Sequence, residues 1–576
     1  MALNLVNQVG EWNPQLFREI KGRLKPRNIL ITVAVSLLGQ LLVLMSFSSQ
    51  LPVANDKNVM HKNVIYNRYC TGTSQGDFNS ISACIPDQFG IFDINWQLWW
   101  QDVFIWLSII GILALLVVGT YMLISDLSKE EQRGTLNFLR LTPQSSESIL
   151  IGKMLGVPIL LYLVGFLALP LHLAAGLSGQ MPFGMILGFY TVLGASCLFF
   201  YSVALLFGLV GTWLGGFQAW LGSGMVLIFL YTMTMMTTSS SHFISQYPID
   251  WVTLFSPSIF LTYLTGTNSL NAAASDPVDG MELLKVWGLP VGASVWSALG
   301  VMLLNYGLWT YWVWQGLKRC FHNPSATLFS KQQSYWLTAC FEVVILGFAL
   351  NPQVADWKSY PRGLFENFQM LLVFNLLMFL CLIAALSPHR QAMQDWARYR
   401  HKNRSRRRGV MSDLIWGEKS PAVIAIALNV AIASAILLPW ILLGPASQYK
   451  IPAVWAVLLS MSLILVYAAV AQLMLFMKLQ KRSAWAVVTV GLLIVLPPFA
   501  FAFLSMSPEM NPEAWLFSAF PWVAVEKTSE MAVFLSVISQ SLTVGLLSLQ
   551  LTRRLRSAGE SSTKAMLSGR LPAAVD

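Results

Sequence analysis

The chain has 576 residues and a net charge of +10, with 55% hydrophobic and only 11% charged residues. Because about a quarter of the residues of an ordinary soluble domain are charged, this composition excludes a soluble globular protein. The mean hydropathy of +0.59 indicates a polytopic membrane protein that has most of its residues in lipid.

Twelve segments qualify or nearly qualify as membrane-crossing helices, each of which needs about 20 mostly apolar residues. Their centres lie at about residues 38, 113, 163, 198, 228, 303, 342, 376, 432, 464, 494 and 541. The expected fold is therefore an all-α, polytopic membrane helical bundle. The first segment follows a polar, basic stretch without the pattern of a cleavable signal peptide, so we expect it to remain as an anchor.

Lysine and arginine are distributed unevenly among the loops. With a cytoplasmic N-terminus, 29 of the 37 fall inside and 8 fall outside. The positive-inside rule then predicts two cytoplasmic termini in a cell membrane, which we expect to be the bacterial inner membrane. This bias and anionic inner-leaflet lipid account for the basic charge, so no nucleic-acid partner is expected.

The cysteines agree with this topology. Cys70 and Cys84 both fall in the long first outside loop, where an oxidising compartment would allow a disulfide; two free thiols are the alternative. Cys197, Cys340 and Cys381 lie in apolar spans, where packing is their simplest role. The sequence contains no CxxC or HExxH motif and no other His/Cys spacing suited to zinc, so no metal site is expected.

The polar segment between the second and third spans carries the most distinctive motif. Residues 132–142 read QRGTLNFLRLT, Pro143 follows, and Gly152 and Lys153 come shortly afterwards. The charges before the motif favour a helical surface segment, and its apolar side chains are suited to docking in an apolar cleft. Pro143 should end this element, and Ser145 or Ser146 should cap a new helix.

This pattern resembles the cytoplasmic coupling loop of type-2 ATP-binding cassette (ABC) exporter permeases. The resemblance also covers residues 13–23 and the order of the helices. It implies that the loop contacts a separate ATPase through Glu131, Arg133, Gly134, Thr135, Leu136, Phe138, Gly152 and Lys153. The family usually has acids where this chain has Gln132 and Asn137, and a loop that only links two helices is the alternative.

Two motifs recur at similar spacing in both halves of the chain. Gly152 and Gly417 each enter the third helix of a half, and Leu-Phe-Ser triplets begin 102 and 99 residues later. This favours an internal duplication and predicts two six-helix permease units, residues 1–334 and 335–576. In the second half, the candidate ATPase contacts are Asp413, Trp416, Gly417 and Glu418.

Short apolar segments on the outer side, residues 251–264 around Pro257 and residues 515–525 around Pro521, contain these triplets. They are too short to span a membrane. By resemblance to the permease family, we expect short re-entrant or interfacial helices there, and an ordinary aromatic belt is the alternative. The basic loop after the eighth span is expected to meet lipid headgroups and carries Arg398, Arg400, Lys402, Arg404, Arg406, Arg407 and Arg408.

The source of energy decides between the possible functions. The sequence lacks a phosphate-binding loop, so ATP and Mg would be bound by a partner chain, with no cofactor and no catalytic residue in this one. The expected function is the membrane-spanning permease subunit of an ATP-driven exporter. Its partners would be two cytoplasmic ATPase subunits, membrane lipids and an unidentified substrate.

Two alternatives stay open. Glu342 is the only acid well inside a predicted span. A bundle-facing or interfacial carboxyl is its simplest role, whereas an ion site there would be typical of an ion-coupled secondary transporter. A non-transporting membrane scaffold or a lipid-modifying enzyme is the other alternative, although no catalytic constellation supports it.

Overall fold

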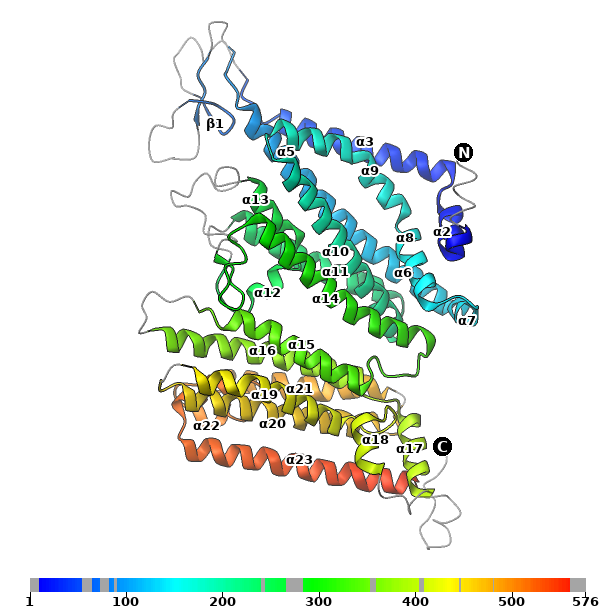
Figure 1. Cartoon of the computed structure of the whole chain (residues 1–576), viewed down its shortest axis with the longest axis vertical. Helices are drawn as coiled ribbons and strands as arrows, with labels where there is room; N and C mark the ends of the chain where they lie inside the picture. The colour runs from blue at the N-terminus through cyan, green and yellow to red at the C-terminus, as the bar shows by residue number, and fades with distance from the viewer. Residues whose placement is uncertain are drawn as a thin grey trace. The chain divides into compact units, whose positions relative to one another are not determined.

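The computed structural model of the chain describes residues 10–53, 65–72, 82–86, 91–239, 244–265, 283–352, 359–402, 409–444, 447–479 and 481–559. Most of them are helical (Figure 1). One small antiparallel sheet pairs β1 (Tyr66–Asn67) with β2 (Ser82–Ala83). The structure joins Cys70 and Cys84 beside this sheet in a disulfide with an S–S distance of 2.05 Å.

Ten described helical stretches are long and apolar enough to cross a membrane: Pro26–Ser48, Trp96–Gln132, Ile159–Ser178, Phe183–Val210, Leu214–Thr237, Tyr360–Leu386, Val423–Leu443, Lys450–Leu475, Arg482–Phe503 and Glu530–Ala558. They confirm the predicted all-α membrane bundle, whereas the count of twelve is not confirmed. The other two predicted centres fall in α14 (Val295–His322) and α15 (Lys331–Ala349). Polar residues such as Asn305 and Glu342 interrupt their apolar sequence.

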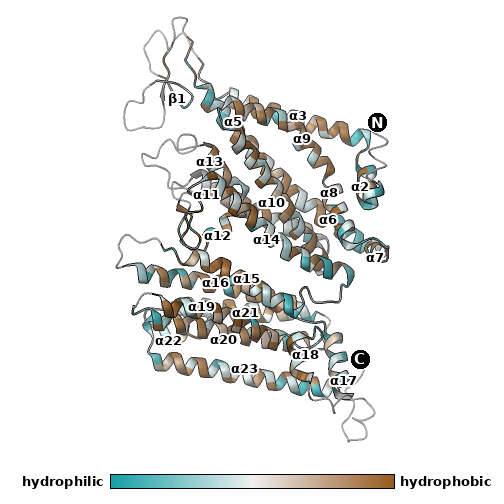
Figure 2. Cartoon of the chain, viewed as in Figure 1, coloured by the Kyte–Doolittle hydropathy of each residue, from teal (hydrophilic) through white to brown (hydrophobic). Residues whose placement is uncertain are grey.

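The chain divides into two compact units. Unit 1 comprises Met1–Ser245, Asp250–Lys285 and Leu289–His322, and unit 2 comprises Gln246–Ile249, Val286–Gly288 and Asn323–Asp576. The assignment of two permease units meeting at residue 334 stays a prediction. Figure 2 shows that hydrophobic residues cover most of the long helices and that hydrophilic residues gather on short elements such as α2 and α17.

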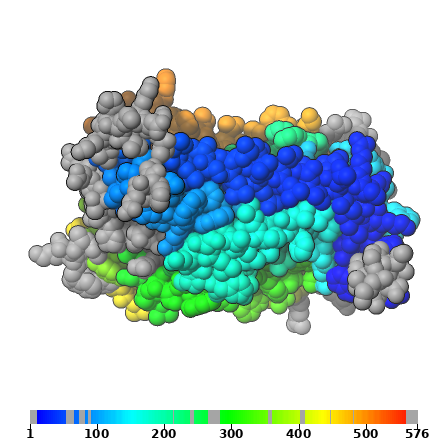
Figure 3. Space-filling model, turned by 90° about the horizontal axis from the view of Figure 1, so that it is seen from above, coloured from blue at the N-terminus to red at the C-terminus, as the bar shows by residue number. Residues whose placement is uncertain are grey.

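Unit 1 contains an amphipathic first helix, six long helical segments and several short helices. Its elements are α2 (Pro14–Arg23), α3 (Pro26–Ser48), α5 (Trp96–Leu113), η1 (Ala114–Val118), α6 (Gly119–Gln132), α7 (Thr135–Arg140), α8 (Ser146–Gly156), α9 (Ile159–Ser178), α10 (Phe183–Val210), η2 (Thr212–Phe217), α11 (Gln218–Ser239), α12 (Asp250–Thr253), η3 (Pro257–Phe260), α13 (Leu261–Thr265) and α14. In Figure 3, blue α3 runs along one face of this unit beside the lighter segment that carries α5.

Unit 2 has a similar series. Its elements are α15, α16 (Tyr360–Leu386), α17 (Arg390–Lys402), α18 (Val410–Trp416), α19 (Val423–Leu443), α20 (Lys450–Leu475), α21 (Arg482–Phe503), α22 (Pro512–Trp515), η8 (Pro521–Val523), η9 (Val525–Lys527) and α23 (Glu530–Gly559). Of the predicted basic cluster, α17 contains Arg398, Arg400 and Lys402, and the other members lie outside the described residues.

The two units share an order of neighbours. In unit 1, α3 packs on α9, α6 on α10, and α10 most extensively on α14. In unit 2, α15 packs on α19, α16 on α20, and α20 most extensively on α23. A common packing order at matching positions is what an internal duplication would produce.

Short helices occupy both predicted outer segments. Pro257 begins η3 and Pro521 begins η8, each at the first position of its turn. Proline suits this position because its fixed φ fits a helix start and the missing N–H has no helical partner there. Whether these helices are re-entrant stays a prediction.

The long second helix of unit 1 contains one π-helical turn, η1, between α5 and α6. Such a turn leaves carbonyl groups without their usual partners. The Tyr201 hydroxyl on α10 donates a 2.7 Å hydrogen bond to the Leu115 carbonyl. Gly119 has no side chain to block the ring, and a Cβ there would overlap Tyr201. The α6–α10 contact therefore depends on a matched glycine and tyrosine.

Candidate functional site

The amphipathic helix α2 docks against α8 at the polar end of unit 1. Its N-cap residue, Asn13, accepts a hydrogen bond from the Leu16 N–H at 3.0 Å and donates one to the Ser148 carbonyl at 2.7 Å. A Cβ at Gly152 would lie 2.8 Å from the Asn13 Oδ1 atom and 2.9 Å from the Leu16 nitrogen. Gly152 therefore serves close helix packing in this structure.

The predicted coupling loop folds as the three helices α6, α7 and α8. Gly134 lies between α6 and α7 with a φ of +72°, which a glycine adopts without strain. Its position has open space around it, so the glycine serves a bend rather than a close approach. Ser145 caps α8 by accepting a 3.2 Å hydrogen bond from the Ser148 N–H. The predicted stop at Pro143 and the fresh helix start are both found.

The short helix α7 has an inner and an outer face. Leu136 is 1% exposed and packs with Leu139 in the apolar core of unit 1. Phe138 is 73% exposed and Leu141 is 85% exposed. Leu136 was expected to face a partner together with Phe138, but helical geometry turns it inward, and the exposed apolar pair is Phe138 and Leu141.

Polar contacts hold α7 in place. The Arg140 Nε atom donates a 2.9 Å hydrogen bond to the Phe321 carbonyl at the end of α14. Nearby, Lys318 of α14 lies 2.6 Å from Glu147 of α8. The end of α7 and the start of α8 are thus attached to the same distant helix, so the exposed face of α7 belongs to a fixed element.

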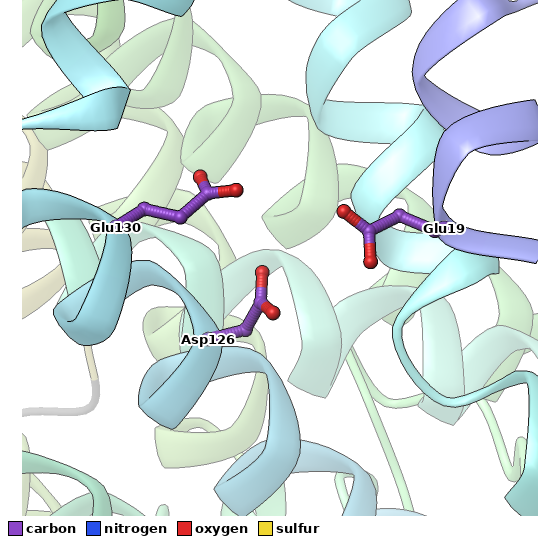
Figure 4. A group of neighbouring side chains, drawn as sticks. All are labelled: Glu19, Asp126 and Glu130. Atoms are coloured by element: carbon purple, nitrogen blue, oxygen red, sulfur yellow. The ribbon is translucent and has the colours of Figure 1, made fainter. Parts of the chain in front are cut away.

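Three acidic side chains, one from α2 and two from α6, come together beside Lys153 of α8. Figure 4 shows Glu19 of α2 pointing toward Asp126 and Glu130 of α6. One carboxylate oxygen of each residue lies within 4.8 Å of a carboxylate oxygen of the other two. The Lys153 Nζ atom lies 2.7 Å from both Asp126 and Glu130, although this side chain is only 1% exposed.

Two arginines of α2 complete the network. Arg23 lies 2.7 Å from Asp126 and 3.1 Å from Glu19, and Arg18 lies 2.7 Å from Glu130. Three acids are thereby matched by three bases, Arg18, Arg23 and Lys153. Because each carboxylate already has a cationic partner, the cluster is an ion-pair network that ties α2 and α8 to the end of α6.

The remaining predicted residues of this loop lie near the α6–α7 bend. Thr135 donates a 3.1 Å hydrogen bond through its hydroxyl to the Glu130 carbonyl, and Glu131 lies 3.8 Å from Arg140. Arg133 is exposed. The structure therefore separates the predicted set into a surface group around the bend and three buried residues, Leu136, Gly152 and Lys153.

Unit 2 also has a buried lysine, Lys331, which contacts the segment between α18 and α19. The Lys331 Nζ atom donates hydrogen bonds to the Leu414 carbonyl at 2.7 Å, the Ser420 hydroxyl at 2.6 Å and the Pro421 carbonyl at 3.2 Å. Tyr335 donates a 2.7 Å hydrogen bond to the Ile415 carbonyl. The start of α15 therefore fixes the end of α18 and the entry to α19.

The predicted residues of unit 2 surround this anchor. Trp416 is 54% exposed and packs edge-on against Tyr335. Asp413 accepts a hydrogen bond from Arg400 of α17. Gly417 caps α18, where a Cβ would crowd the Asp413 carbonyl, and Glu418 is exposed. Trp416 and Glu418 are thus surface candidates, whereas Asp413 and Gly417 shape the turn.

Several supporting residues were not among the predicted site residues. They are Arg18, Glu19, Arg23, Asp126, Arg140, Leu141 and Lys331. The charged stretch of α2 was visible in the sequence, but its partners on α6 are 103 and 112 residues away. Leu141 belongs to the apolar side chains of the motif that were expected to be suited to docking, although it was not among the predicted ATPase contacts.

The comparisons with known proteins add no identification. No family model matches the sequence, and no curated protein and no solved structure matches it either.

Proposed function

We propose that this chain is the membrane-spanning permease subunit of an ATP-driven ABC exporter and that separate cytoplasmic ATPase subunits energise it. One observation carries the proposal: Phe138 of α7 and Leu141, which caps this helix, are exposed. Arg140 fixes α7 to α14, and the buried ion-pair network fixes the preceding helix α6. Large apolar side chains held rigidly at a polar loop are typical of a partner-binding surface.

The second unit supports two points of attachment. Trp416 and Met411 of α18 are both more than half exposed, and Lys331 holds the end of this helix. Each unit thus offers one short helix with exposed apolar residues, which is held by Arg140 in unit 1 and by Lys331 in unit 2. We propose that each helix receives one ATPase subunit, identical or not, and that ATP and Mg are bound there rather than in this chain.

In this proposal, ATP binding draws the two ATPase subunits together and moves α7 and α18. The units then switch between discrete packed arrangements that expose the transport path to alternate sides of the membrane. Both termini are cytoplasmic, and the exported substrate is unidentified. The isolated chain should hydrolyse no ATP.

Co-purification tests the proposal. The double variant Phe138→Asp with Leu141→Asp should lose a cytoplasmic ATPase that the tagged full chain retains after extraction from its native membrane. Asn137→Asp is the matched control, because it adds a negative charge beside Phe138 without removing an apolar contact. Absence of an ATPase from the wild-type sample, or its retention by the double variant, would overturn the proposal.

One observation favours ion-coupled secondary transport as the second candidate. Glu342 is fully buried in unit 2, where one carboxylate oxygen accepts a 3.3 Å hydrogen bond from Asn375 and the other has no hydrogen-bond partner among the described residues. If this candidate is correct, Glu342→Gln should abolish transport driven by a proton or sodium gradient in ATP-free vesicles. ATP-dependent export that survives the substitution would favour the ABC proposal.

A further inference from the structure

A cavity of about 770 Å³ lies at one end of α3 and α5 in unit 1. Its volume falls within the range of small-molecule sites, about 300–1,000 Å³. One wall reaches from Leu42 in α3 to Gln50, just past the end of that helix, and the other from Asp102 to Ile110 in α5. The α5 wall is nine residues long, and its ends lie about 12 Å apart along the helix axis.

The cavity is apolar at one end and polar at the other. Leu42, Val43, Trp106 and Ile110 line the part that lies within the two apolar helices. Asn67 and Arg68 close the opposite end. A ligand that fills both parts must carry a polar head and an apolar tail.

The polar end is held firmly. The Trp99 indole N–H donates a 3.1 Å hydrogen bond to the Phe47 carbonyl, which fastens α5 to α3. Asn67 donates a 2.9 Å hydrogen bond to the Gln50 carbonyl, and the disulfide at Cys70 follows within three residues. The segment that carries Arg68 is therefore tied both to α3 and to the small sheet.

The charges at this end favour a ligand with acceptor oxygens. Arg68 donates one 3.0 Å hydrogen bond to Asp102, and its Nε atom is buried without a hydrogen-bond partner among the described residues. A guanidinium carries five N–H donors, so donors remain for a ligand. Asp102 is almost fully buried, and its other oxygen accepts from Tyr69 at 3.1 Å.

Tryptophans near the polar end favour a ligand with a lipid headgroup. Trp96, Trp99 and Trp100 form the first turn and a half of α5, and tryptophans gather where a membrane meets water. The apolar walls continue into exposed residues of α3 and α5, including Leu42 and Trp106. An acyl chain can therefore enter directly from the bilayer.

We propose that this cavity binds a phospholipid of the surrounding bilayer, with its phosphate at Arg68 and an acyl chain between α3 and α5. The lipid is a resident ligand of unit 1 and does not depend on the proposed ATPase. Arginine suits phosphate because its planar donors match phosphate oxygens.

Photolabelling of the full chain in phosphatidylcholine nanodiscs tests the proposal. Two probes with a diazirine on the acyl chain are added at equal trace amounts, one a phosphatidylglycerol and the other a diacylglycerol without phosphate. Label in residues 42–50 and 106–110 is divided by label on the exposed face of α21, residues 492–503. In wild type we expect this ratio to be at least fivefold higher for the phosphate probe.

Three variants sharpen the test. Arg68→Gln combined with Asp102→Asn removes the ion pair without leaving a buried charge, and it should abolish the preference for the phosphate probe. Asp102→Asn alone keeps Arg68 and should keep the preference. Ser46→Trp fills the cavity and should lower the ratio for both probes.

The control is Arg362→Gln, which removes an arginine that pairs with Glu366 outside the cavity, and it should match wild type. Equal ratios for the two probes in wild type would overturn the proposal. So would an unchanged preference in the Arg68→Gln, Asp102→Asn double variant. ATPase binding is expected to be unchanged in all variants, which keeps this test separate from that of the proposed function.

Discussion

The Nζ atom of Lys153 lies 2.7 Å from a carboxylate oxygen of Asp126, in a setting where the lysine side chain is almost completely inaccessible to water. A buried ammonium group is tolerated only when its charge is compensated. The two acids of α6 supply that compensation, and they are in turn held by the arginines of α2.

Lys153→Met should therefore destabilise unit 1 by about 3–5 kcal/mol, because it leaves buried carboxylates with one cation fewer. Lys318→Met is the control, since Lys318 pairs with Glu147 at a half-exposed site, where a pair contributes at most about 1 kcal/mol. Thermal unfolding of the detergent-solubilised proteins measures the difference. Equal midpoints for the two variants would contradict the structural role assigned to the network.

The two faces of α7 predict that substitutions at Leu136 and Phe138 differ strongly in their effect on stability. Leu136→Asp places a charge in the apolar core and should cost more than about 4 kcal/mol, enough to prevent stable folding of unit 1. Phe138→Asp changes an exposed side chain and should leave the free energy of unfolding within about 0.5 kcal/mol of the wild-type value. Yield of monodisperse protein after membrane extraction distinguishes the two, and similar losses would argue against the orientation of α7.

Gly134→Ala should destabilise the α6–α7 bend by about 1–2 kcal/mol, because a side chain disfavours a φ of +72°. Gly165→Ala in α9 is the matched control: its site has room for a Cβ, and alanine generally favours a helix. The rate of limited proteolysis between α6 and α7 reports on the bend. Faster cleavage is expected only for Gly134→Ala, and unchanged cleavage would count against the strained position.

The stability of unit 2 should depend on pH through Lys331. Burial lowers the pKa of Lys331 to about 8, and Asp413 opposes this shift. The unfolded chain, with the ordinary lysine pKa of about 10.4, binds more protons between these values, so stability should rise with pH from about 8 to about 10.4. Below pH 8 both states are protonated and this dependence vanishes.

Lys331→Met removes the titrating group and should flatten this part of the stability profile. The measurement is the unfolding midpoint of wild type and variant at half-unit steps from pH 7 to pH 10.5. Because other lysines titrate in the same range, the result is the difference between the two curves. A difference that does not change with pH would show that the Lys331 pKa is not lowered.

Local sequence patterns predicted the positions of most helices. Runs of apolar residues located the spanning helices, and Pro143 with Ser145 located the break before α8, because these signals act within a few residues. Two of the twelve predicted spans, α14 and α15, are not confirmed, because their sequences contain enough polar residues to depart from the pattern of a membrane span. The positions of these helices were predicted from the sequence, and their assignment as spans stays a prediction.

Less of the candidate site could be predicted from the sequence. The inward turn of Leu136 depends on a core that includes Leu317 and Phe321 of α14, and Arg140 reaches a carbonyl 181 residues away. Lys331 finds its acceptors 83 to 90 residues later. Motifs identify the segment that carries such residues, but only tertiary packing decides which of them face outward.

The continuous helical stretch from Trp96 to Gln132 has 37 residues and is therefore about 55 Å long. A hydrocarbon core of about 30 Å accommodates little more than half of it. One end of this rod borders the cavity at Arg68, and the other ends at Gly134, where α7 begins. The remainder of the rod must therefore project from the hydrocarbon core. Its charged end, with Lys129, Glu130 and Glu131, carries α7 clear of the lipid, where a water-soluble partner can reach Phe138.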